Sequence, residues 1–311
     1  MTINQLGDTP IRGIFFLLGG VFIFSTQDVF IKYLSSGYPL FEIMFIRSLA
    51  GIVPCLLIVH FDSGLKSLKT KRIGAHFLRS TLMFIAYIFY YLGIAALPLA
   101  DAVALFFTAP FFVTILSIII VCERVKLTQW ASLFTGFIGV LIIMSPGFGI
   151  FDSAAIFPII AALTYSCTAL ITRNVAGSES ASVIGFNMMI YFLLMSGVLG
   201  LLLGNGIILD DPHPSLVFVT RAWIFPSVKD LGIMIGIGIF VSFGFYCLAQ
   251  AYRVAKSSTI TPFEYAGMVP AVLWGFVFWN EIPSPTTLIG ILFIISSGLY
   301  LIRQQTRKRT A

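Results

Sequence analysis

Charge is the first thing this sequence lacks. Asp, Glu, Lys and Arg together make up 10% of its 311 residues, whereas a soluble domain carries roughly a quarter. Hydrophobic residues account for 58% of the chain, and the mean hydropathy is +0.99. A chain of this composition cannot hide its apolar surface from water. It must therefore use lipid as part of its solvent.

Residues that carry reactive chemistry are also scarce. The three histidines stand at no metal-ligand spacing, and the four cysteines lie inside or at the end of apolar runs, which argues against a metal cluster or a disulfide framework. The sequence contains no phosphate-binding Walker loop and no Ser/His/Asp arrangement at one depth. We therefore expect no cofactor, no metal, no enzyme activity and no ATP-driven transport by this chain alone.

Signals for secretion and for β-strands are missing too. Residues 1–13 are polar and lack a basic segment followed by a small-residue cleavage site, so we expect no cleavable signal peptide. Segments that alternate polar and apolar residues are absent, which disfavours an outer-membrane barrel. The net charge of +6 would suggest a nucleic-acid partner in a soluble protein. Here we attribute it to membrane topology and expect no nucleic-acid binding.

Long apolar runs are what the chain has instead. Runs of about 20 residues, the length a helix needs to cross a bilayer core, recur from end to end. Prolines in the fourth and ninth runs (Pro110, Pro262 and Pro270) mark places where a helix could bend. The runs predict an all-α polytopic membrane protein with ten transmembrane helices, at residues 13–34, 39–60, 73–96, 100–121, 128–145, 152–173, 182–204, 230–252, 257–279 and 284–303.

The basic residues fall almost entirely on one side of this topology. If the N-terminus is cytoplasmic, fourteen Lys and Arg residues lie inside and three (Lys32, Arg221 and Lys229) lie outside, with Arg47 and Arg79 within the membrane. This distribution predicts an even number of spans with both termini in the cytoplasm. We expect the membrane to be the inner membrane of a bacterium.

The chain also repeats itself. Residues 79–125 share their layout with a stretch near the C-terminus, and an offset of 158 places Glu123 on Glu281. An offset of 141 places residues 24–32 on residues 165–173.

Each half of the chain then holds five spans, at 13–145 and 155–303. Because five is odd, the two halves must insert with opposite orientations. Inverted repeats of this kind place a substrate site near the membrane midplane, at the interface between the halves.

Small residues in the fifth, eighth and tenth predicted helices favour close helix contacts. Packing within the bundle is the favoured interpretation, and a homodimer seam is the alternative. These residues are Ala131, Gly136, Gly139, Gly232, Gly236, Gly290, Ser297 and Gly298.

Residues 79–125 closely resemble the first repeat of the EamA family, in the drug/metabolite transporter superfamily. Phe45-Ile46-Arg47, the Pro-Phe-Glu-Tyr of residues 262–265 and the Glu-Ile-Pro of residues 281–283 are similar to its patterns as well. The resemblance covers nearly the whole chain. It implies a ten-helix basket around a central cavity lined by helices 1, 3, 4, 6, 8 and 9. Family members that the chain resembles include exporters of amino acids and drugs, riboflavin carriers and S-adenosylmethionine uptake carriers.

Charged residues inside the predicted spans need a partner or a water-filled cavity, because each costs about 2.5–3.5 kcal/mol near the bilayer centre. Asp28 and Arg47 stand at matching depths in helices 1 and 2 and are predicted to pair, either as a structural ion pair or as part of a site. Arg79 in helix 3 either extends its guanidinium to the inner surface or contacts the substrate.

Glu264 is the sharpest functional candidate. It lies on a predicted cavity helix next to Pro262, and its counterpart in the first repeat is Phe106, so the symmetry of the packing does not require a carboxylate here. A buried carboxylate could carry a coupling proton or bind a cationic group. A structural hydrogen bond is the alternative.

Aromatic residues make up 15% of the chain, and some lie on the predicted cavity helices beside polar groups. Flat aromatic walls with a few fixed polar groups suit a planar or amphiphilic organic ligand, and rings attract ammonium or sulfonium groups. Core packing is the alternative for any one ring. The candidate substrate-binding residues are Gln27, Asp28, Arg47, Arg79, Tyr87, Tyr91, Phe106, Tyr165, Thr168, Tyr246, Gln250, Glu264, Tyr265 and Trp274.

Together these features predict a secondary carrier that moves a small organic metabolite across the membrane by alternating access. Acidic and basic candidates beside aromatic rings favour a zwitterionic, amino-acid-like or nucleoside-bearing cargo, a description that S-adenosylmethionine fits. A proton-coupled exporter of amino acids or aromatic drugs is the first alternative. A membrane-embedded enzyme is disfavoured, and a non-transporting scaffold is a further alternative. The expected partners are the cargo, the lipid bilayer and a coupling proton or counter-substrate.

Overall fold

The computed structural model describes residues 9–70, 72–97, 99–144, 153–175, 179–206, 213–279 and 285–310, and these ranges contain helices and no strand. The 3₁₀ helices are η2 (Leu65–Leu68), η3 (Ser153–Ala155) and η4 (Thr261–Gly267). The α-helices are α1 (Pro10–Ser35), α2 (Leu40–Asp62), α3 (Ile73–Ala96), α4 (Leu99–Phe106), α5 (Ala109–Val121), α6 (Leu127–Met144), α7 (Ile156–Val175), α8 (Ala181–Leu203), α9 (Pro214–Thr220), α10 (Val228–Val254), α11 (Ser257–Ile260), α12 (Met268–Trp279) and α13 (Pro285–Thr310).

The helices account for all ten predicted spans. Eight stretches of the described residues are long and apolar enough to cross a membrane, and shorter apolar stretches lie in α6 (Leu127–Ile142) and α13 (Leu288–Tyr300). The predicted all-α polytopic fold is therefore confirmed.

The predicted fourth and ninth spans are each interrupted. The fourth consists of α4 and α5, with a break at residues 107–108, and Pro110 stands in the first turn of α5. The ninth consists of α11, η4 and α12, and Pro262 stands in the first turn of η4. Because proline lacks a backbone N–H, it fits the start of a helical segment and not its interior.

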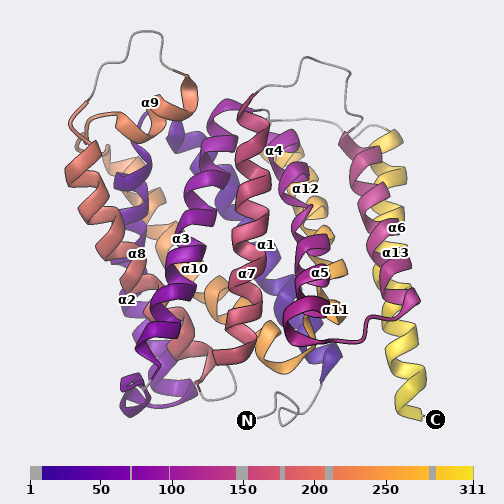
Figure 1. Ribbon diagram of the computed structural model, residues 1–311. Helices are drawn as coiled ribbons and strands as arrows, with labels where there is room; N and C mark the ends of the chain where they lie inside the picture. Colours follow the sequence, from indigo (N-terminus) through magenta and orange to yellow (C-terminus); the bar gives the residue numbers. More distant parts are fainter. Residues whose placement is uncertain are drawn as a thin grey trace.

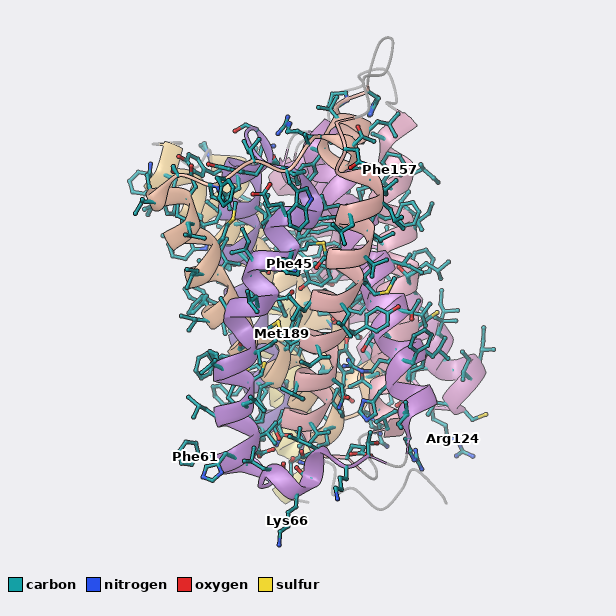
Figure 2. The ribbon with its side chains drawn as sticks, turned by 90° about the vertical axis from the view of Figure 1, so that its left-hand side faces the viewer. Phe45, Phe61, Lys66, Arg124, Phe157 and Met189 are labelled. Atoms are coloured by element: carbon teal, nitrogen blue, oxygen red, sulfur yellow. The ribbon has the colours of Figure 1, made fainter. Side chains whose placement is uncertain are left out.

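The spanning helices stand side by side in one bundle (Figure 1). At the lower end of this view α1 begins and α13 ends, and we call it the N/C end. The opposite end carries α9, and we call it the α9 end. Lys66 and Arg124, two of the basic residues predicted to be cytoplasmic, both project at the N/C end (Figure 2).

Helices from the two halves of the chain pack against each other. The principal pairs are α1 with α10, α2 with α8, α3 with α7 and α6 with α13. The core therefore forms along the seams between the first five spans and the last five.

Small residues permit two of these seams. Where α2 crosses α10, the Ser242 hydroxyl donates to the Gly51 carbonyl at 3.0 Å, and a Cβ added at Gly238 would collide with the Arg47 carbonyl oxygen. Where α6 meets α13, the hydroxyls of Ser132 and Ser297 each donate to the other residue's carbonyl, at 3.0 and 2.9 Å.

Gly139 lies in the same α6–α13 seam, where an added Cβ would approach the Gly290 carbonyl oxygen to 2.7 Å. Packing within the bundle thus accounts for Gly139, Gly290 and Ser297 in this seam, whereas Ala131 of α6 is exposed. Gly232 and Gly236 of α10 differ, because an added Cβ would meet nothing within 4 Å.

Large apolar side chains cover the outside of the bundle (Figure 2). Phe61 is 82% exposed, Leu201 79% and Ile119 68%. Soluble proteins rarely expose apolar surface on this scale, so the surface is suited to contact lipid acyl chains.

Candidate functional site

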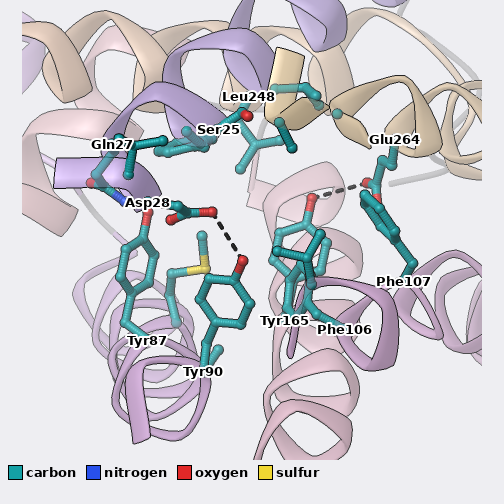
Figure 3. Close-up of a pocket in the computed structure, with 18 residues that line it drawn as sticks. Ser25, Gln27, Asp28, Tyr87, Tyr90, Phe106, Phe107, Tyr165, Leu248 and Glu264 are labelled. Atoms are coloured by element: carbon teal, nitrogen blue, oxygen red, sulfur yellow. Dashed lines mark hydrogen bonds between the residues drawn. The ribbon is translucent and has the colours of Figure 1, made fainter. Parts of the chain in front are cut away.

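A cavity of about 130 Å³ lies between the two halves of the chain. Its walls come from α1, α3, α4, α7, α10 and the η4–α12 segment. These correspond to predicted spans 1, 3, 4, 6, 8 and 9, the set that the family resemblance implies. Figure 3 shows polar and aromatic side chains from these elements converging on one space. The charged residues in its lining are Asp28 and Glu264.

Asp28 belongs to a polar network that joins three helices. Its Oδ2 accepts a hydrogen bond of 2.9 Å from the Tyr90 hydroxyl on α3 (Figure 3). The neighbouring Gln27 donates from Nε2 to the Tyr91 hydroxyl at 2.7 Å. Nη1 of Arg47, on α2, donates to Gln27 Oε1 at 2.5 Å and to the Tyr91 hydroxyl at 3.1 Å. A buried network of this kind fixes the orientation of the groups that line the cavity.

Arg47 is enclosed by aromatic rings and is 1% exposed. Its guanidinium carbon lies 4.9 Å from the ring centroid of Tyr87, 5.8 Å from that of Tyr91 and 6.0 Å from that of Phe192. Ring faces stabilise a cation that has lost its water. Arg47 contacts two cavity-lining residues, Gln27 and Tyr87, and so supports the wall from behind.

Glu264 is held on the opposite side of the cavity. Its Oε1 accepts a hydrogen bond of 2.9 Å from the Tyr165 hydroxyl on α7 and a second hydrogen bond from the Tyr252 hydroxyl on α10 (Figure 3 draws the first). The residue is 6% exposed. It lies in η4, whose irregular backbone suits a segment that lines a cavity, because such backbone is tolerated at membrane depth only away from lipid.

Aromatic rings form the wall between the two carboxylates. The Phe106 ring lies 4.8 Å from that of Tyr90 and 5.5 Å from that of Tyr165, measured between centroids. Phe107 also lines the cavity, and it packs edge-on at 5.7 Å against Tyr265, which is fully buried behind it. A flat organic group could lie against these rings while a cationic group approaches Asp28 or Glu264.

The sequence profile of the EamA-like transporter family matches residues 11–145, the segment that contributes α1, α3 and α4 to this cavity. The rest of the chain contributes the remaining cavity elements.

Similar proteins align over nearly the whole chain. The S-adenosylmethionine uptake transporter of Rickettsia prowazekii is 25% identical and aligns over 99% of this chain and 98% of its own length. The riboflavin transporter of Vibrio cholerae is 28% identical over 96% of this chain and 95% of its own length. The pseudopaline exporter of Pseudomonas aeruginosa is 24% identical over 91% of this chain and 93% of its own length.

A protein of known crystal structure superposes on 93% of this chain, and on 98% of its own, with a TM-score of 0.77 and 14% sequence identity. At this identity the likeness concerns the fold. The family match and the named relatives together identify the chain as a multi-pass membrane transporter of a small metabolite, and not an enzyme.

The predicted site residues fall into groups according to where the structure places them. Gln27, Asp28, Tyr87, Phe106, Tyr165 and Glu264 line the central cavity. Tyr91, Arg47 and Tyr265 lie directly behind that lining. Arg79 and Thr168 line a second, smaller cavity, which Tyr165 also lines.

The remaining three predicted residues line neither of these two cavities. The Tyr246 hydroxyl donates to Asp62 Oδ1 at 3.2 Å, at the end of α2. Gln250 accepts a hydrogen bond of 3.4 Å from Nη1 of Arg253. The Trp274 ring packs against Phe22 and Phe278, at centroid distances of 5.6 and 6.0 Å.

Two expectations about charged residues are wrong. Within the described part of the chain Asp28 and Arg47 form no ion pair within 4.0 Å, because Gln27 and the Tyr91 hydroxyl occupy the guanidinium instead. Arg79 does not extend to the inner surface. It is 3% exposed and donates to a backbone carbonyl inside the bundle.

The sequence analysis missed two of the three tyrosines that hold the two carboxylates, and it named the third, Tyr165. Tyr90 and Tyr252 bind Asp28 and Glu264, yet neither was a candidate. Tyr90 directly precedes the candidate Tyr91 and points to a different part of the same site. Tyr252 lies in the last turn of α10, where hydropathy alone gives no sign that the side chain turns toward the core.

A further charged group lies at the N/C end, where α5, α7, α10 and α11 meet. Nη1 of Arg173 donates to the Ala255 carbonyl at 2.5 Å and lies 3.5 Å from Glu123 Oε1. Glu123 Oε2 accepts from the Ser258 backbone N–H at 3.3 Å. We call Arg173, Glu123, Ala255 and Ser258 the Arg173 cluster. It joins the first half of the chain, through Glu123, to the second half.

Proposed function

We propose that this chain is a secondary carrier that moves a zwitterionic, amino-acid-like or nucleoside-bearing metabolite across a bacterial inner membrane by alternating access. The observation that carries the proposal is the central cavity, in which Asp28 and Glu264 stand beside aromatic walls. Two carboxylates attract a cationic group, and the rings bind it or a flat base. S-adenosylmethionine combines a sulfonium, an amino acid and a nucleoside, and the name of the Rickettsia prowazekii relative supports it as a candidate.

The size of the cavity supports a carrier that changes shape. At about 130 Å³ it is smaller than the 300–1,000 Å³ of pockets that enclose drug-sized ligands. A nucleoside-bearing cargo therefore needs the walls to move apart, and the interrupted helices α4–α5 and α11–η4–α12 offer hinges for that movement.

Helix pairing supports two inverted repeats. In the two-fold relation predicted from the sequence, spans 1 and 6 exchange, as do spans 3 and 8. The pairing of α1 with α10 then maps onto the pairing of α7 with α3, and both occur. The pairs α2–α8 and α6–α13 map onto themselves.

Side-chain contacts support the same relation at opposite ends of the bundle. Lys32 Nζ donates to the Leu97 carbonyl at 3.4 Å, and Arg173 Nη1 donates to the Ala255 carbonyl at 2.5 Å. The sequence offsets of 141 and 158 carry Lys32 onto Arg173 and Leu97 onto Ala255. In an inverted repeat the Lys32–Leu97 and Arg173–Ala255 contacts are equivalent, and each end of the bundle has one of them, as alternating access requires.

Glu264 is the proposed coupling site for protons. Two tyrosine hydroxyls bind its Oε1, and among the described residues no basic side chain lies within 4.0 Å of its carboxylate. Such a carboxylate can alternate between a proton and a cationic cargo group, and this observation favours the alternative function, a proton-coupled exporter of amino acids or aromatic drugs. The name of the Pseudomonas aeruginosa relative, an exporter, is consistent with that alternative.

Counterflow in proteoliposomes tests the proposal and separates the two functions. Acceleration of S-adenosylmethionine uptake by internal S-adenosylmethionine, without pH dependence, is expected for exchange. Dependence on a proton gradient that is lost in Glu264→Gln is expected for proton antiport. Uptake that is unchanged in both Glu264→Ala and Asp28→Ala would contradict either form of transport through this cavity.

We also propose that both termini lie in the cytoplasm. The start of α1 and the end of α13 lie at the same end of the bundle, the end that carries Lys66 and Arg124. A cysteine at residue 310 should react with an impermeant thiol reagent in inside-out vesicles and stay unlabelled in intact spheroplasts. The opposite pattern would reverse the orientation.

A further inference from the structure

Arg79 is a buried cation that the central cavity does not explain. It lies on α3 and is 3% exposed. Its Nη2 donates to the Ile184 carbonyl at 2.6 Å, and its Nη1 lies at the limit of a hydrogen bond, 3.5 Å, from the Thr172 hydroxyl. Its Nε has no partner, and no carboxylate of the described chain lies within 4.0 Å of the guanidinium. Burying a cation without an anion is unfavourable, so an anion that binds there would be stabilised.

Arg79 lines a second cavity. That cavity measures about 10 Å³, room for roughly one water molecule, and Thr168 and Thr172 line it together with Arg79. Met83, Tyr165 and Leu248 line both this cavity and the central one. These three side chains are therefore the partition between the two spaces.

The charges on the two sides of this partition are opposite. Asp28 and Glu264 line the central cavity, and Arg79 lines the second one. Thr172, the hydroxyl partner of Arg79, lies seven residues beyond Tyr165 on α7, roughly 10 Å closer to the N/C end. A cargo that moves toward the N/C end therefore leaves a space with two carboxylates and enters one with a guanidinium.

We propose that Arg79 is a second binding station, which takes the carboxylate of a zwitterionic cargo once the Tyr165 side chain has moved aside. This inference rests on the proposed transport function and specifies the orientation of the cargo: its cationic group stays at Glu264 while its carboxylate reaches Arg79. When Tyr165 moves, its hydrogen bond to Glu264 breaks. The same movement therefore frees Glu264 for the cationic group and opens the way to Arg79 for the carboxylate.

A carboxylate suits this station better than a phosphate does. Arg79 is the charged residue in the lining of the second cavity, so one positive charge is available there. The Thr168 and Thr172 hydroxyls donate to backbone carbonyls one turn earlier, at 3.1 and 2.8 Å, and so are not free to neutralise a dianion. A guanidinium edge matches a single carboxylate in a two-pronged hydrogen bond.

Two probes that differ only in the carboxylate test the station. The full-length chain in nanodiscs is titrated with S-adenosylmethionine and with decarboxylated S-adenosylmethionine. Wild type should bind the carboxylate form about ten- to a hundredfold more tightly, the range expected for charged hydrogen bonds. Arg79→Gln should bring that ratio close to one without changing the affinity for the decarboxylated probe, and Arg79→Lys should keep part of the preference.

The Arg79→Gln variant also distinguishes a binding role of Arg79 from a purely structural one, because the glutamine amide can still donate to the Ile184 carbonyl. If Arg79→Gln weakens both probes by the same factor, Arg79 only ties α3 to α8 and the station is refuted. If wild type binds both probes equally while Asp28→Asn weakens both, the transport proposal stands and the station fails. If wild type binds neither probe, the proposed cargo class fails and the station fails with it.

Discussion

Replacing Arg173 with glutamine tests whether the Arg173 cluster keeps the central cavity closed toward the N/C end. In the structure the guanidinium bridges the Ala255 carbonyl and the Glu123 carboxylate, which belong to different halves of the chain. If the halves separate at this end when the cavity opens to the N/C side, the contact between Arg173 and Glu123, which crosses from one half to the other, must break. Arg173→Gln removes this contact from the closed state only and therefore favours the open state.

The size of the effect follows from how deeply the pair is buried. The Arg173 and Glu123 side chains are 13% and 7% exposed. Exposed pairs contribute about 0.2–1 kcal/mol, and breaking a fully buried pair costs about 3–5 kcal/mol. For this intermediate case, in which the separated groups regain water, we expect about 1–2 kcal/mol. That energy changes the ratio of open to closed molecules roughly 5- to 30-fold.

Thiol labelling inside the cavity measures this ratio without knowledge of the cargo. Ser25 lines the cavity, and its hydroxyl has no hydrogen-bond partner within the described chain, so Ser25→Cys is a mild substitution. The four native cysteines are first replaced with alanine or serine. A membrane-impermeant maleimide, added from the N/C side, should then label the Arg173→Gln protein roughly 5- to 30-fold faster than the parent.

Two further variants make the result decisive. Exchanging the charges (Arg173→Glu with Glu123→Arg) should restore part of the pair and slow the labelling again. Arg12→Gln removes a basic residue at the N/C end outside the Arg173 cluster and should leave the labelling rate unchanged. Equal rates in Arg173→Gln and its parent, or equal acceleration by Arg12→Gln, would refute the idea that this cluster holds the end closed.

Two other predictions concern the cavity and the fold. Asp28→Asn should weaken binding of S-adenosylmethionine about ten- to a hundredfold in equilibrium titrations, because it removes a charge that faces the cargo. Tyr90→Phe removes only a hydrogen bond to Asp28 and should weaken binding less than tenfold. Equal affinities in Asp28→Asn and wild type would contradict a cation site at Asp28. Gly238→Ala should lower the thermal unfolding temperature, because its Cβ meets the Arg47 backbone, while Gly236→Ala meets nothing and should leave that temperature unchanged or raise it slightly. Identical melting curves for the two alanine variants would argue against the close approach of α2 and α10.

The fold was largely predictable because its signals are local. Run length and hydropathy located the ten spans, and the similarity of residues 79–125 to a known family indicated which helices surround the cavity. The breaks in the fourth and ninth spans coincide with Pro110 and Pro262, which sterically favour the start of a new helical segment.

The site was less predictable, because in a lipid-covered bundle both the inner and the outer faces of a helix are apolar. A pattern of hydrophobic residues therefore does not say which face turns inward. Trp274 and Tyr246 are on cavity helices yet lie away from the central cavity. Tyr90 and Tyr252 acquire their roles from carboxylates far away in the sequence, and no spacing within their own helices reveals those partners.

The backbone at Cys122 has a practical consequence. Its φ of 55° lies in the left-handed region, and among the described non-glycine residues it alone has a positive φ. This turn ends α5 and leaves the Cys122 thiol exposed, one residue before Glu123. A spin label on this native sulfur would report changes in mobility at the C-terminal end of α5 during turnover. The chain thus supplies its own attachment point for spectroscopy at the seam where its two halves should part.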